Sequence, residues 1–553
     1  MSINKIETTL KESLAAAVIK AGLKSEIDGS KIVIEIPKDT KNGDYSSNVA
    51  MQLTRELRQN PRMIATAIID NLDKETAGID RVEIAGPGFI NFFMKGDTLN
   101  SIIGEVLAEG EKYGYSNYGK GEKFNIEFVS ANPTGDLHLG HARGASLGDS
   151  ICRIMSAAGY DVTREYYIND AGNQINNLAY SLMARYNQAF GMEVEMPEDG
   201  YHGKDVIKIA EDIKNEIGDR YLNDNSEEAY KYFRKVGVEK ELAKLKGVLE
   251  DFRVHFDVWF SETSLYEENR ILPTLEKLKE GGYTYEQDGA LWLRTTDFGD
   301  DKDRVLIKTD GSYTYLTPDI SYHLNKLDRG FNKLVDLLGA DHHGYIARMK
   351  AAIQALGYNA DQLDIDIIQM VRLVRDGQEV KMSKRTGNAV TIRDLMEDIG
   401  VDATRYFFAA KAGSSMFDFD LDLAASKTND NPVYYAQYAH ARMCSIEAQA
   451  LNANVNVADH YEMITHPKEI ELLKHINEFR NVVVDSATAR APHKIATYTQ
   501  RLATLFHSFY NECKVVDKEN VELSSQRLAL IAATKITLKN ALALIGVSAP
   551  EKM

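Results

Sequence analysis

Cysteine is scarce in this sequence. The chain of 553 residues contains three cysteines, Cys152, Cys444 and Cys513, and no CxxC pair. Cysteine zinc sites need closely spaced ligands, and disulfide frameworks need more cysteines than this. We therefore exclude both, and we expect a protein of the reducing cytoplasm.

Long apolar runs are also missing. No segment approaches the roughly 18 to 20 apolar residues that span a bilayer, so we expect no membrane partner. Residues 1–24 mix acidic, basic and apolar side chains, which predicts an amphipathic helix rather than a signal peptide. There are no internal repeats and no low-complexity tracts.

The sequence lacks an excess of positive charge. Its net charge is -17, but residues 431–553 contain 13 Lys and Arg against 12 Asp and Glu, so the acidity lies in the first 430 residues. This balance excludes a non-specific polyanion binder, although clustered basic residues can still bind phosphate locally. The length alone suggests about three domains.

The order of the expected elements divides the chain into three parts. Residues 1–105 predict a small α+β unit, which ends in a strand, a glycine-rich turn and a strand over 81–94. Residues 106–425 predict a parallel α/β sheet, with strands at 123–130 and 161–170 around a helix that begins near 138. The sheet resumes at 333, after an insertion at about 171–325. Residues 426–553 are expected to be helical throughout.

The first chemical motif is "EFVSANPTGDLHLGHARGA", residues 127–145. His138 and His141 could be ordinary helix-start residues or metal ligands, but no nearby Cys, Asp or Glu completes a metal site. A strand that leads through small residues to a helix N-terminus presents free N–H groups to an anion. Gly140 lets a flat ring approach the backbone. The motif thus predicts a nucleotide phosphate site.

The second motif is "VKMSKRTGN", residues 380–388. Three positive charges in nine residues are often no more than a solvated loop. Here Ser383, Thr386 and Gly387 make the loop pliable, and Lys381 and Lys384 can act as point charges on a leaving pyrophosphate. The two motifs in this order, about 240 residues apart, are much more specific than either alone.

"HLGH" (138–141) and "KMSKR" (381–385) resemble the two signature sequences of class I aminoacyl-tRNA synthetases, and residues 127–144 resemble the arginyl-tRNA synthetase version. "GDYSSNVA", "GPGFINFFM", "YLTPDISYH", "GADHHGY", "DATRYFFAAK" and "NPVYYAQYAHAR" extend the resemblance over the whole chain. It implies a multidomain α/β protein: a Rossmann-like parallel-sheet catalytic domain with an insertion, an N-terminal α+β domain that binds the tRNA D-loop, and a C-terminal all-α helical-bundle domain that binds the anticodon.

The implied activity is arginine–tRNA ligation: L-arginine, ATP and tRNA(Arg) give Arg-tRNA, AMP and pyrophosphate. Mg²⁺ would accompany the triphosphate, no structural metal is expected, and a monomer is the family default. The family generally needs bound tRNA before it activates the amino acid. The implied catalytic residues are His138, His141, Lys381 and Lys384. The implied ATP-binding residues are Pro133, Gly135, His138, Gly140, His141, His342, His343, Lys381, Met382, Ser383 and Lys384.

Arginine binding can be considered from its chemistry. A guanidinium group prefers carboxylates and aromatic faces. Glu127 in an apolar strand would be a costly buried charge unless it is paired, and Tyr315 and Asp319 share one side of a helix if that segment is helical, although Asp319 could also be a helix cap. By similarity, Glu127 and Asp319 hold the charged groups and Tyr315 walls the side chain. Ser130 and Asn132, with His138, orient the α-amino and carboxylate ends.

Two parts of the chain are implied to contact tRNA. In the first, Phe89 would stack on a D-loop base and Asn91 would read its edge. Gly86 stands where some relatives carry a side chain. In the helical part, tyrosines at helical spacing are often core residues, but the resemblance assigns the anticodon contacts to Tyr435, Tyr438, Ala439, Arg442 and the terminal Met553.

Other classes of protein fit less well. Nucleotidylyltransferases share an HxGH loop but lack the distant lysine loop and the large helical C-terminus. A cysteinyl enzyme would need zinc ligands, and a glutamyl or glutaminyl enzyme would need cationic residues where Glu127 and Asp319 stand. A tRNA-binding relative without catalysis would not need His138, His141, Lys381 and Lys384.

Overall fold

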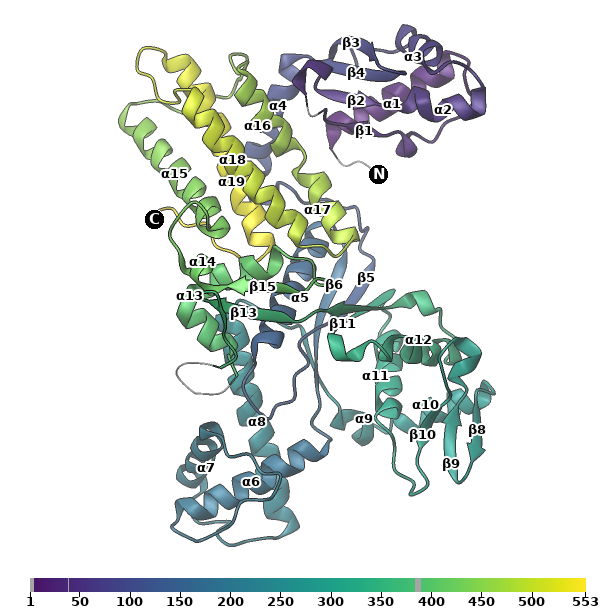
Figure 1. Ribbon diagram of the computed structural model, residues 1–553, viewed down its shortest axis with the longest axis vertical. Coiled ribbons are helices and arrows are strands. Elements are labelled where there is room, and N and C mark those ends of the chain that lie inside the picture. Colours follow the sequence, from purple (N-terminus) through teal and green to yellow (C-terminus); the bar gives the residue numbers. More distant parts are fainter. Residues whose placement is uncertain (1–3, 38, 383–388) are drawn as a thin grey trace.

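The computed structural model describes residues 4–37, 39–382 and 389–553. The N-terminal unit and the long C-terminal helices lie at one end of the molecule, and two separate lobes lie at the other (Figure 1). A parallel sheet stands between them. This arrangement is the multidomain α/β class I fold that the sequence predicted, with one α+β and one all-helical domain around a parallel sheet.

The N-terminal unit is an antiparallel sheet, in the order β1-β2-β4-β3, that packs on helices. Apolar residues Ile90, Phe92 and Met94 alternate along one strand and are buried in its core. Its elements are β1 (Ile34–Glu35), β2 (Tyr45–Ser47), β3 (Ile79–Ala85), β4 (Phe89–Met94), α1 (Lys5–Lys20), α2 (Val49–Leu57) and α3 (Pro61–Asp70).

The next helix, α4 (Gly96–Glu109), leaves this unit and packs against the C-terminal helices α16 (Pro467–Asn477) and α19 (Val521–Leu544). Asn100 of α4 donates to the Tyr461 carbonyl at 2.7 Å. Most of this helix falls inside the 1–105 unit expected from the sequence. An amphipathic helix does not reveal in its own sequence which neighbour covers its apolar face.

The central sheet has five parallel strands in the order β12-β11-β5-β6-β7. From the central strand β5, the chain adds β6 and β7 on one side and then β11 and β12 on the other. The strand order therefore reverses between β5 and β11, and parallel sheets bind ligands at such a switch point. The elements are β5 (Lys123–Glu127), α5 (Leu139–Ala157), β6 (Asp161–Ile168), β7 (Val258–Ser261), α11 (Leu316–Asp328), β11 (Lys333–Gly339), α12 (Tyr345–Ala355) and β12 (Leu363–Ile368).

The expected insertion at about 171–325 is two lobes, because β7 lies between them and pairs with β6. One lobe is helical and has its own core. The other pairs helices with an antiparallel sheet, in the order β10-β9-β8. The first lobe contains α6 (Asn173–Ala189), α7 (Lys204–Ile217) and α8 (Glu227–Asp251). The second contains α9 (Thr263–Glu267), α10 (Ile271–Glu280), β8 (Thr284–Gln287), β9 (Ala290–Leu293) and β10 (Arg304–Ile307).

A small sheet and a helix carry the lysine loop. The sheet has the order β14-β13-β15, and β13 pairs in parallel with β15. A helix kinked at Gly400 (φ 83°) follows the loop. These elements are β13 (Val371–Arg375), β14 (Gln378–Glu379), α13 (Ile392–Ala409), β15 (Phe417–Asp420) and α14 (Leu421–Ala425).

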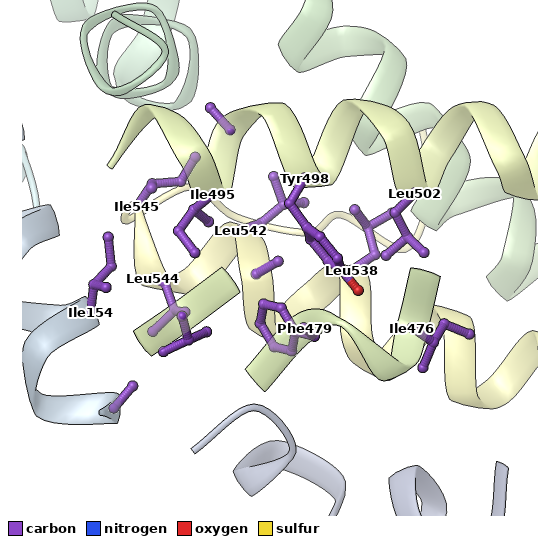
Figure 2. Close-up of a cluster of buried hydrophobic side chains, with 14 of the residues drawn as sticks. Ile154, Ile476, Phe479, Ile495, Tyr498, Leu502, Leu538, Leu542, Leu544 and Ile545 are labelled. Atoms are coloured by element: carbon purple, nitrogen blue, oxygen red, sulfur yellow. The ribbon is translucent and has the colours of Figure 1, made fainter. Parts of the chain in front are cut away.

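The C-terminal helices share a core with the catalytic domain. Ile154 of α5 belongs to the same cluster of buried apolar side chains as Ile495, Leu544 and Ile545 (Figure 2). Burial of large apolar side chains across this boundary fixes the helical domain to the helix that carries the histidine motif. The helices other than α16 and α19 are α15 (Pro432–Asn452), α17 (Phe479–Thr488) and α18 (His493–Glu512).

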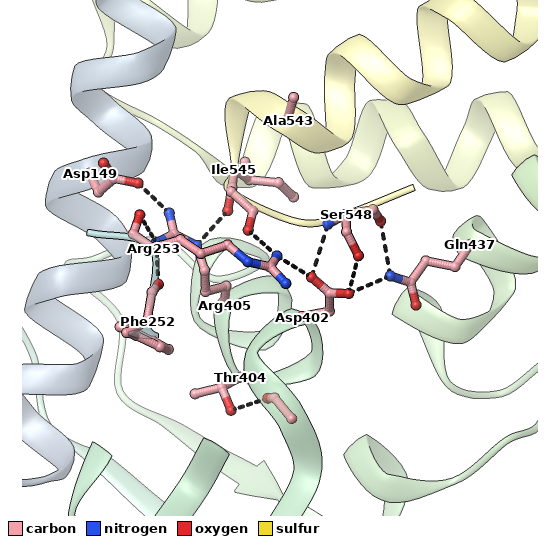
Figure 3. Close-up of polar contacts among 12 residues, drawn as sticks. Asp149, Phe252, Arg253, Asp402, Thr404, Arg405, Gln437, Ala543, Ile545 and Ser548 are labelled. Atoms are coloured by element: carbon pink, nitrogen blue, oxygen red, sulfur yellow. Dashed lines mark hydrogen bonds and ion pairs between the residues drawn. The ribbon is translucent and has the colours of Figure 1, made fainter. Parts of the chain in front are cut away.

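Polar contacts hold the end of the chain to the same helix (Figure 3). The fully buried Arg405 of α13 donates to Asp149 of α5 at 2.5 Å and to the Ile545 carbonyl at 3.1 Å. Asp402 accepts hydrogen bonds from Gln437 of α15 and from the Ser548 N–H, each at 2.9 Å. The last turn of the helical domain is thus connected to both α5 and α13.

Candidate active site

The loop after β5 has strained backbone. Val129 (φ 68°) and Ser130 (φ 41°) both lie in the left-handed region, which costs a β-branched residue most. Two hydrogen bonds of the Ser130 hydroxyl stabilise the turn: it donates to Glu127 at 2.9 Å and accepts from the Tyr167 N–H at 3.0 Å. This strained loop follows β5, one of the two strands at the switch point, where a ligand site is expected.

This strain gives a stability prediction. Ser130→Gly and Ser130→Ala both remove the hydroxyl, but only glycine adopts the left-handed conformation without penalty. We expect the alanine variant to be about 1 kcal/mol less stable than the glycine variant in denaturant unfolding. Equal stability of the two variants would show that the protein does not experience this strain.

His138 and His141 begin helix α5. Nδ1 of His138 accepts the Gly140 N–H at 3.1 Å, and Nδ1 of His141 accepts the His138 N–H at 3.2 Å, a reciprocal cap. The rings stack with centroids 3.8 Å apart. Burial lowers the pKa of both, for His141 to about 4 with a contribution from His138. Both imidazoles are therefore neutral at pH 7, and each has its proton on Nε2, where it can be donated to a ligand.

The lysine loop returns directly to this motif. The Leu139 N–H donates to the Val390 carbonyl at 3.0 Å, and the Ile392 N–H donates to the Leu137 carbonyl at 2.8 Å. The side chains of Lys381 and Met382 are exposed, and Lys381 lies 3.7 Å from Glu379. Ser383 and Lys384 lie outside the described residues. Residues 390–392, which directly follow the lysine loop in sequence, therefore lie beside the histidine motif.

The expected ATP residues around the histidines differ in exposure. Gly140 is exposed, Gly135 is half-buried and Pro133 is buried. His342 and His343 are exposed on the turn after β11, at the same carboxyl edge of the sheet as the loop after β5. These residues therefore lie at one edge of the sheet, where parallel sheets bind ligands.

Glu127 is a buried charge with a partner that the sequence did not indicate. Lys326 of α11 donates to Glu127 at 2.5 Å and to Asp336 of β11 at 2.9 Å. His323 contacts Asp336 at 2.7 Å. Burial alone would lower the pKa of His323, but the Asp336 charge raises it above its usual value. Glu127 and Asp336 thus share the Lys326 ammonium group, so Glu127 has the partner that a buried charge requires.

Two further carboxylates have no such partner. Asp319 accepts a hydrogen bond from the Tyr345 hydroxyl at 3.2 Å, and Glu262, which follows β7, is buried. Within the described part of the chain, neither forms an ion pair. Burial raises the pKa of both. For Asp319, the nearby His323 opposes this rise and the Glu127 and Glu262 charges add to it, which gives a pKa of about 7. The carboxyl edge of the sheet therefore has a cluster of acidic groups with a deficit of positive charge.

The remaining residues expected to bind arginine are more open. Asn132 is half-buried and donates to Gln174 of α6 at 2.7 Å. Tyr315 precedes the first turn of α11 and is 83% exposed, so it does not enclose a pocket as it stands. Asp319 lies inside the helix rather than at its cap.

A second cavity, of about 590 Å³, lies on the helical domain. His507 of α18 contacts the rings of Tyr435 and Tyr438, with centroids 5.0 and 5.9 Å away. Its Nε2 is buried without a hydrogen-bond partner among the described residues. The cavity is lined by Lys427, Thr428, Asn429, Tyr434, Tyr435, Tyr438, Arg442, His507 and Asn511.

Of the expected tRNA contacts, Tyr435, Tyr438 and Arg442 line this cavity. Ala439 is fully buried, and Met553 is exposed at the chain end. On β4, Phe89 is half-buried, but Asn91 is only 4% exposed and accepts a hydrogen bond from Ser46 at 2.7 Å. The structure does not present Ala439 or the Asn91 amide at the surface.

Comparison with known proteins places this geometry in a family. Residues 5–94 match the arginyl tRNA synthetase N terminal domain, residues 102–443 match the class I (R) tRNA synthetase catalytic domain, and residues 436–553 match the DALR anticodon binding domain. The chain is 57% identical to arginine--tRNA ligase 2 of Bacillus thuringiensis over 558 residues, all of both chains. The chain belongs to the arginyl-tRNA synthetase family.

Other relatives of this synthetase agree. It is 57% identical to the arginine--tRNA ligase of Bacillus subtilis over 99% of both chains. A putative arginyl-tRNA synthetase structure from Campylobacter jejuni has a TM-score of 0.76 at 38% identity and covers 83% of this chain and 99% of its own. The Thermus thermophilus arginyl-tRNA synthetase has the same fold, with a TM-score of 0.75 at 20% identity over 100% of both chains.

No helix in the described parts of this synthetase has the length and apolar character to cross a membrane. The three cysteines, all within those parts, are unpaired. Sequence reasoning missed Glu262, Lys326, Asp336 and His507, which come from distant segments. Only Glu262 had a local signal, since it follows the short apolar run "VWFS" as ligand residues follow strands in such sheets.

Proposed function

We propose that this chain joins arginine to tRNA(Arg) in two steps at the crevice between β5 and β11. In the first, an arginine carboxylate oxygen attacks the α-phosphorus of ATP and pyrophosphate leaves, which gives arginyl-adenylate. In the second, a terminal ribose hydroxyl of tRNA attacks the arginyl carbonyl carbon and AMP leaves. The observation that carries the proposal is that the histidine motif is hydrogen-bonded to residues 390–392, just after the lysine loop, at the sheet edge that also holds carboxylates without an ion pair among the described residues.

At the phosphates, the roles follow from charge and donor geometry. The Nε2 protons of His138 and His141 are free to donate to phosphate oxygens, and the helix N-terminus adds a favourable dipole. Lys381 and Lys384 would neutralise the leaving pyrophosphate, which is the main way in which fixed charges accelerate phosphate displacement. Gly140, Pro133 and Gly135 would leave room for the nucleoside, with His342 and His343 opposite and Met382 and Ser383 on the loop.

Magnesium would arrive with the triphosphate. Among the described residues, no group of three or more His, Cys, Asp or Glu side chains is arranged to hold a metal ion. Mg²⁺ binds phosphate oxygens and water readily and needs few protein ligands. We accordingly assign it to the ATP complex and not to a protein site.

The guanidinium of arginine supplies the missing positive charge. Asp319 and Glu262 are the carboxylates without a cation, and two acceptors suit the planar fork of a guanidinium. Glu127, held by Lys326, would position Ser130 and Asn132 toward the α-amino and carboxylate ends. Tyr315 would cover the side chain only after moving toward Asp319.

For tRNA, we assign the anticodon loop to the cavity on the helical domain and the D-loop to the half-buried Phe89. Aromatic rings beside a basic residue are typical of platforms for unstacked bases. The functional units would be 1–105, 106–425 and 426–553, with the adjustment that α4 packs with the last unit. We further propose that the enzyme acts as a monomer in the cytoplasm.

The direct test is aminoacylation of total tRNA with each amino acid in turn. We expect arginine alone to be incorporated, and pyrophosphate exchange to depend on arginine and to be much faster with tRNA(Arg) present. Incorporation of another amino acid, or of none, would overturn the proposal. Exchange at full rate without tRNA would refute only its tRNA dependence.

The anticodon assignment predicts a role for His507. His507→Ala removes an aromatic face and an unsatisfied polar atom from the cavity, so we expect kcat/KM for tRNA to fall about 5- to 100-fold, the range of one base stack. Steady-state aminoacylation with arginine saturating measures this. His493→Ala is the matched control, because His493 is half-buried on the same helix outside the cavity lining. An equal loss in both variants would contradict the assignment.

A further inference from the structure

Arg143 is a buried cation with an unusual set of partners. It lies two residues after His141 on α5 and is 1% exposed. Its Nη1 donates to the carbonyls of Gln369 at 2.5 Å and Met370 at 3.3 Å. Its Nη2 donates to the carbonyls of Ala412 at 2.9 Å and Ser415 at 2.8 Å. In the described chain, no ion pair joins this guanidinium to a carboxylate.

A buried guanidinium is costly, and a carboxylate would compensate it better than carbonyl dipoles do. Burial lowers the pKa of Arg143 to about 10, so the group remains charged at pH 7. Its planar fork has fixed donor directions, which allow one side chain to bind two backbone segments at once. The Phe417 ring lies 4.9 Å from the guanidinium carbon and fixes its plane. The four hydrogen bonds therefore fix the positions of two backbone segments, although they compensate the buried charge less well than a carboxylate would.

The two segments that Arg143 joins are the two ends of the unit that carries the lysine loop. Gln369 and Met370 lead into β13, which continues through β14 to Lys381. Ala412 and Ser415 follow α13, the helix that begins after the loop, and lead into β15. The two ends are also joined to each other, because β13 pairs in parallel with β15. Figure 1 shows this small sheet beside α5.

The loop has a second attachment on the same helix, at the hydrogen bonds of Leu137 and Leu139 with Ile392 and Val390. From these observations we infer that Arg143 is a positioning residue, which sets the lysine loop relative to His138 and His141 through four backbone carbonyls. The inference rests on the proposed activation of arginine by both motifs.

The test is Arg143→Lys, which keeps the charge but cannot reach both segments with one ammonium group. In arginine-dependent pyrophosphate exchange with tRNA present, kcat should fall about 10- to 100-fold, as expected for a misplaced catalytic group. The dissociation constant of arginine, measured by calorimetry without ATP, should change less than about twofold because no arginine contact is altered. A parallel rise in that constant would overturn the inference.

The control is Arg304→Lys. Arg304 is a mostly buried arginine of β10 that binds Asp300 through two donors at 2.8 Å, far along the chain from the loop. If it lowers kcat as much as Arg143→Lys at an equal loss of melting temperature, Arg143 has only a structural role. Should Arg143→Lys fail to fold, Phe417→Leu removes the ring beneath the guanidinium and should give a smaller fall in kcat of the same kind.

A double-mutant cycle with Lys381→Ala tests whether Arg143 acts through the loop. If it does, Arg143→Lys should cost much less in kcat once Lys381 is gone, and the two effects should be sub-additive. Additive effects would overturn the inference. Absence of arginine-dependent exchange in the unaltered enzyme would instead refute the proposed function, so the two failures are distinguishable.

Discussion

Replacement of Asp319 by asparagine should weaken arginine binding by about 30-fold to several thousand-fold, the cost of truncating one partner of a desolvated charge pair. Asparagine has the same shape and can still accept the Tyr345 hydrogen bond, so the change removes mainly the negative charge. Calorimetric titration of arginine measures the effect, and kcat/KM for arginine should fall in parallel.

The same residue predicts a pH dependence. Burial raises the pKa of Asp319 to about 7, so the group is largely protonated below pH 7 in the free protein. A guanidinium needs the ionised form, and arginine affinity should therefore rise by up to tenfold per pH unit below 7 and level off above it. Binding at pH 6 should release about one proton. The Asp319→Asn variant should lose both behaviours.

The raised pKa has the opposite effect on stability. Between the unfolded pKa near 4 and the folded value near 7, the native state holds more protons than the unfolded state, so Asp319 destabilises the free protein as pH rises through that window. Bound arginine removes this cost. Asp328→Asn is the matched control, since Asp328 is exposed on the same helix. A pH-independent arginine affinity in the unaltered protein would contradict the proposed charge deficit.

The residues of this site that lie in short sequence motifs can be predicted from the sequence. The histidine motif combines a strand end, small residues and a helix start within 19 residues, so its role as a capped helix N-terminus beside a sheet edge can be predicted from its pattern alone. Asp319 could be predicted because it belongs to the same short segment as Tyr315. The exposure of Tyr315 could not, because it depends on how α11 meets the neighbouring lobe.

The rest of the site depends on contacts between distant segments. Lys326 pairs with Glu127 across 199 positions, and no pattern in either segment indicates the other. Glu262 fell within a stretch interpreted as insertion, since the edge strand before it has only four residues. The same physical reason explains α4, because its sequence does not show which neighbour covers its apolar face.

Replacement of Lys326 by methionine should have the second large effect, which is a local loss of stability around the site. Lys326→Met retains the apolar stem of the side chain but leaves Glu127 and Asp336 buried without their shared cation. Breaking a buried ion pair from one side typically costs about 3 to 5 kcal/mol. His323 can compensate only Asp336, so Glu127 is expected to lose its anchor and the Ser130 turn with it.

A single unfolding temperature would not isolate this effect in a protein with several domains. Amide hydrogen exchange can, and we expect faster exchange in β5, β11 and α11 with little change in α15 to α19. Lys333→Met is the control, because Lys333 is a partly exposed lysine of β11, and it contacts Asp364 at 3.1 Å. Similar exchange in both variants would contradict the role of Lys326.

The defect of Lys326→Met should also depend on pH, in a direction that identifies its cause. Burial alone would raise the pKa of Asp336, and the Lys326 and His323 charges hold it low. Without the lysine, this folded-state pKa rises, so ionisation of Asp336 stabilises the fold less and the defect grows as pH increases beyond about 4. Exchange in β5 and β11 should consequently approach that of the unaltered protein at pH 5 and diverge at pH 8, once rates are corrected for intrinsic exchange. A defect of the same size at both pH values would indicate lost packing of the lysine stem. In that case the carboxylates of the crevice would not need a cation, and the electrostatic argument that assigns arginine to Asp319 and Glu262 would lose its basis.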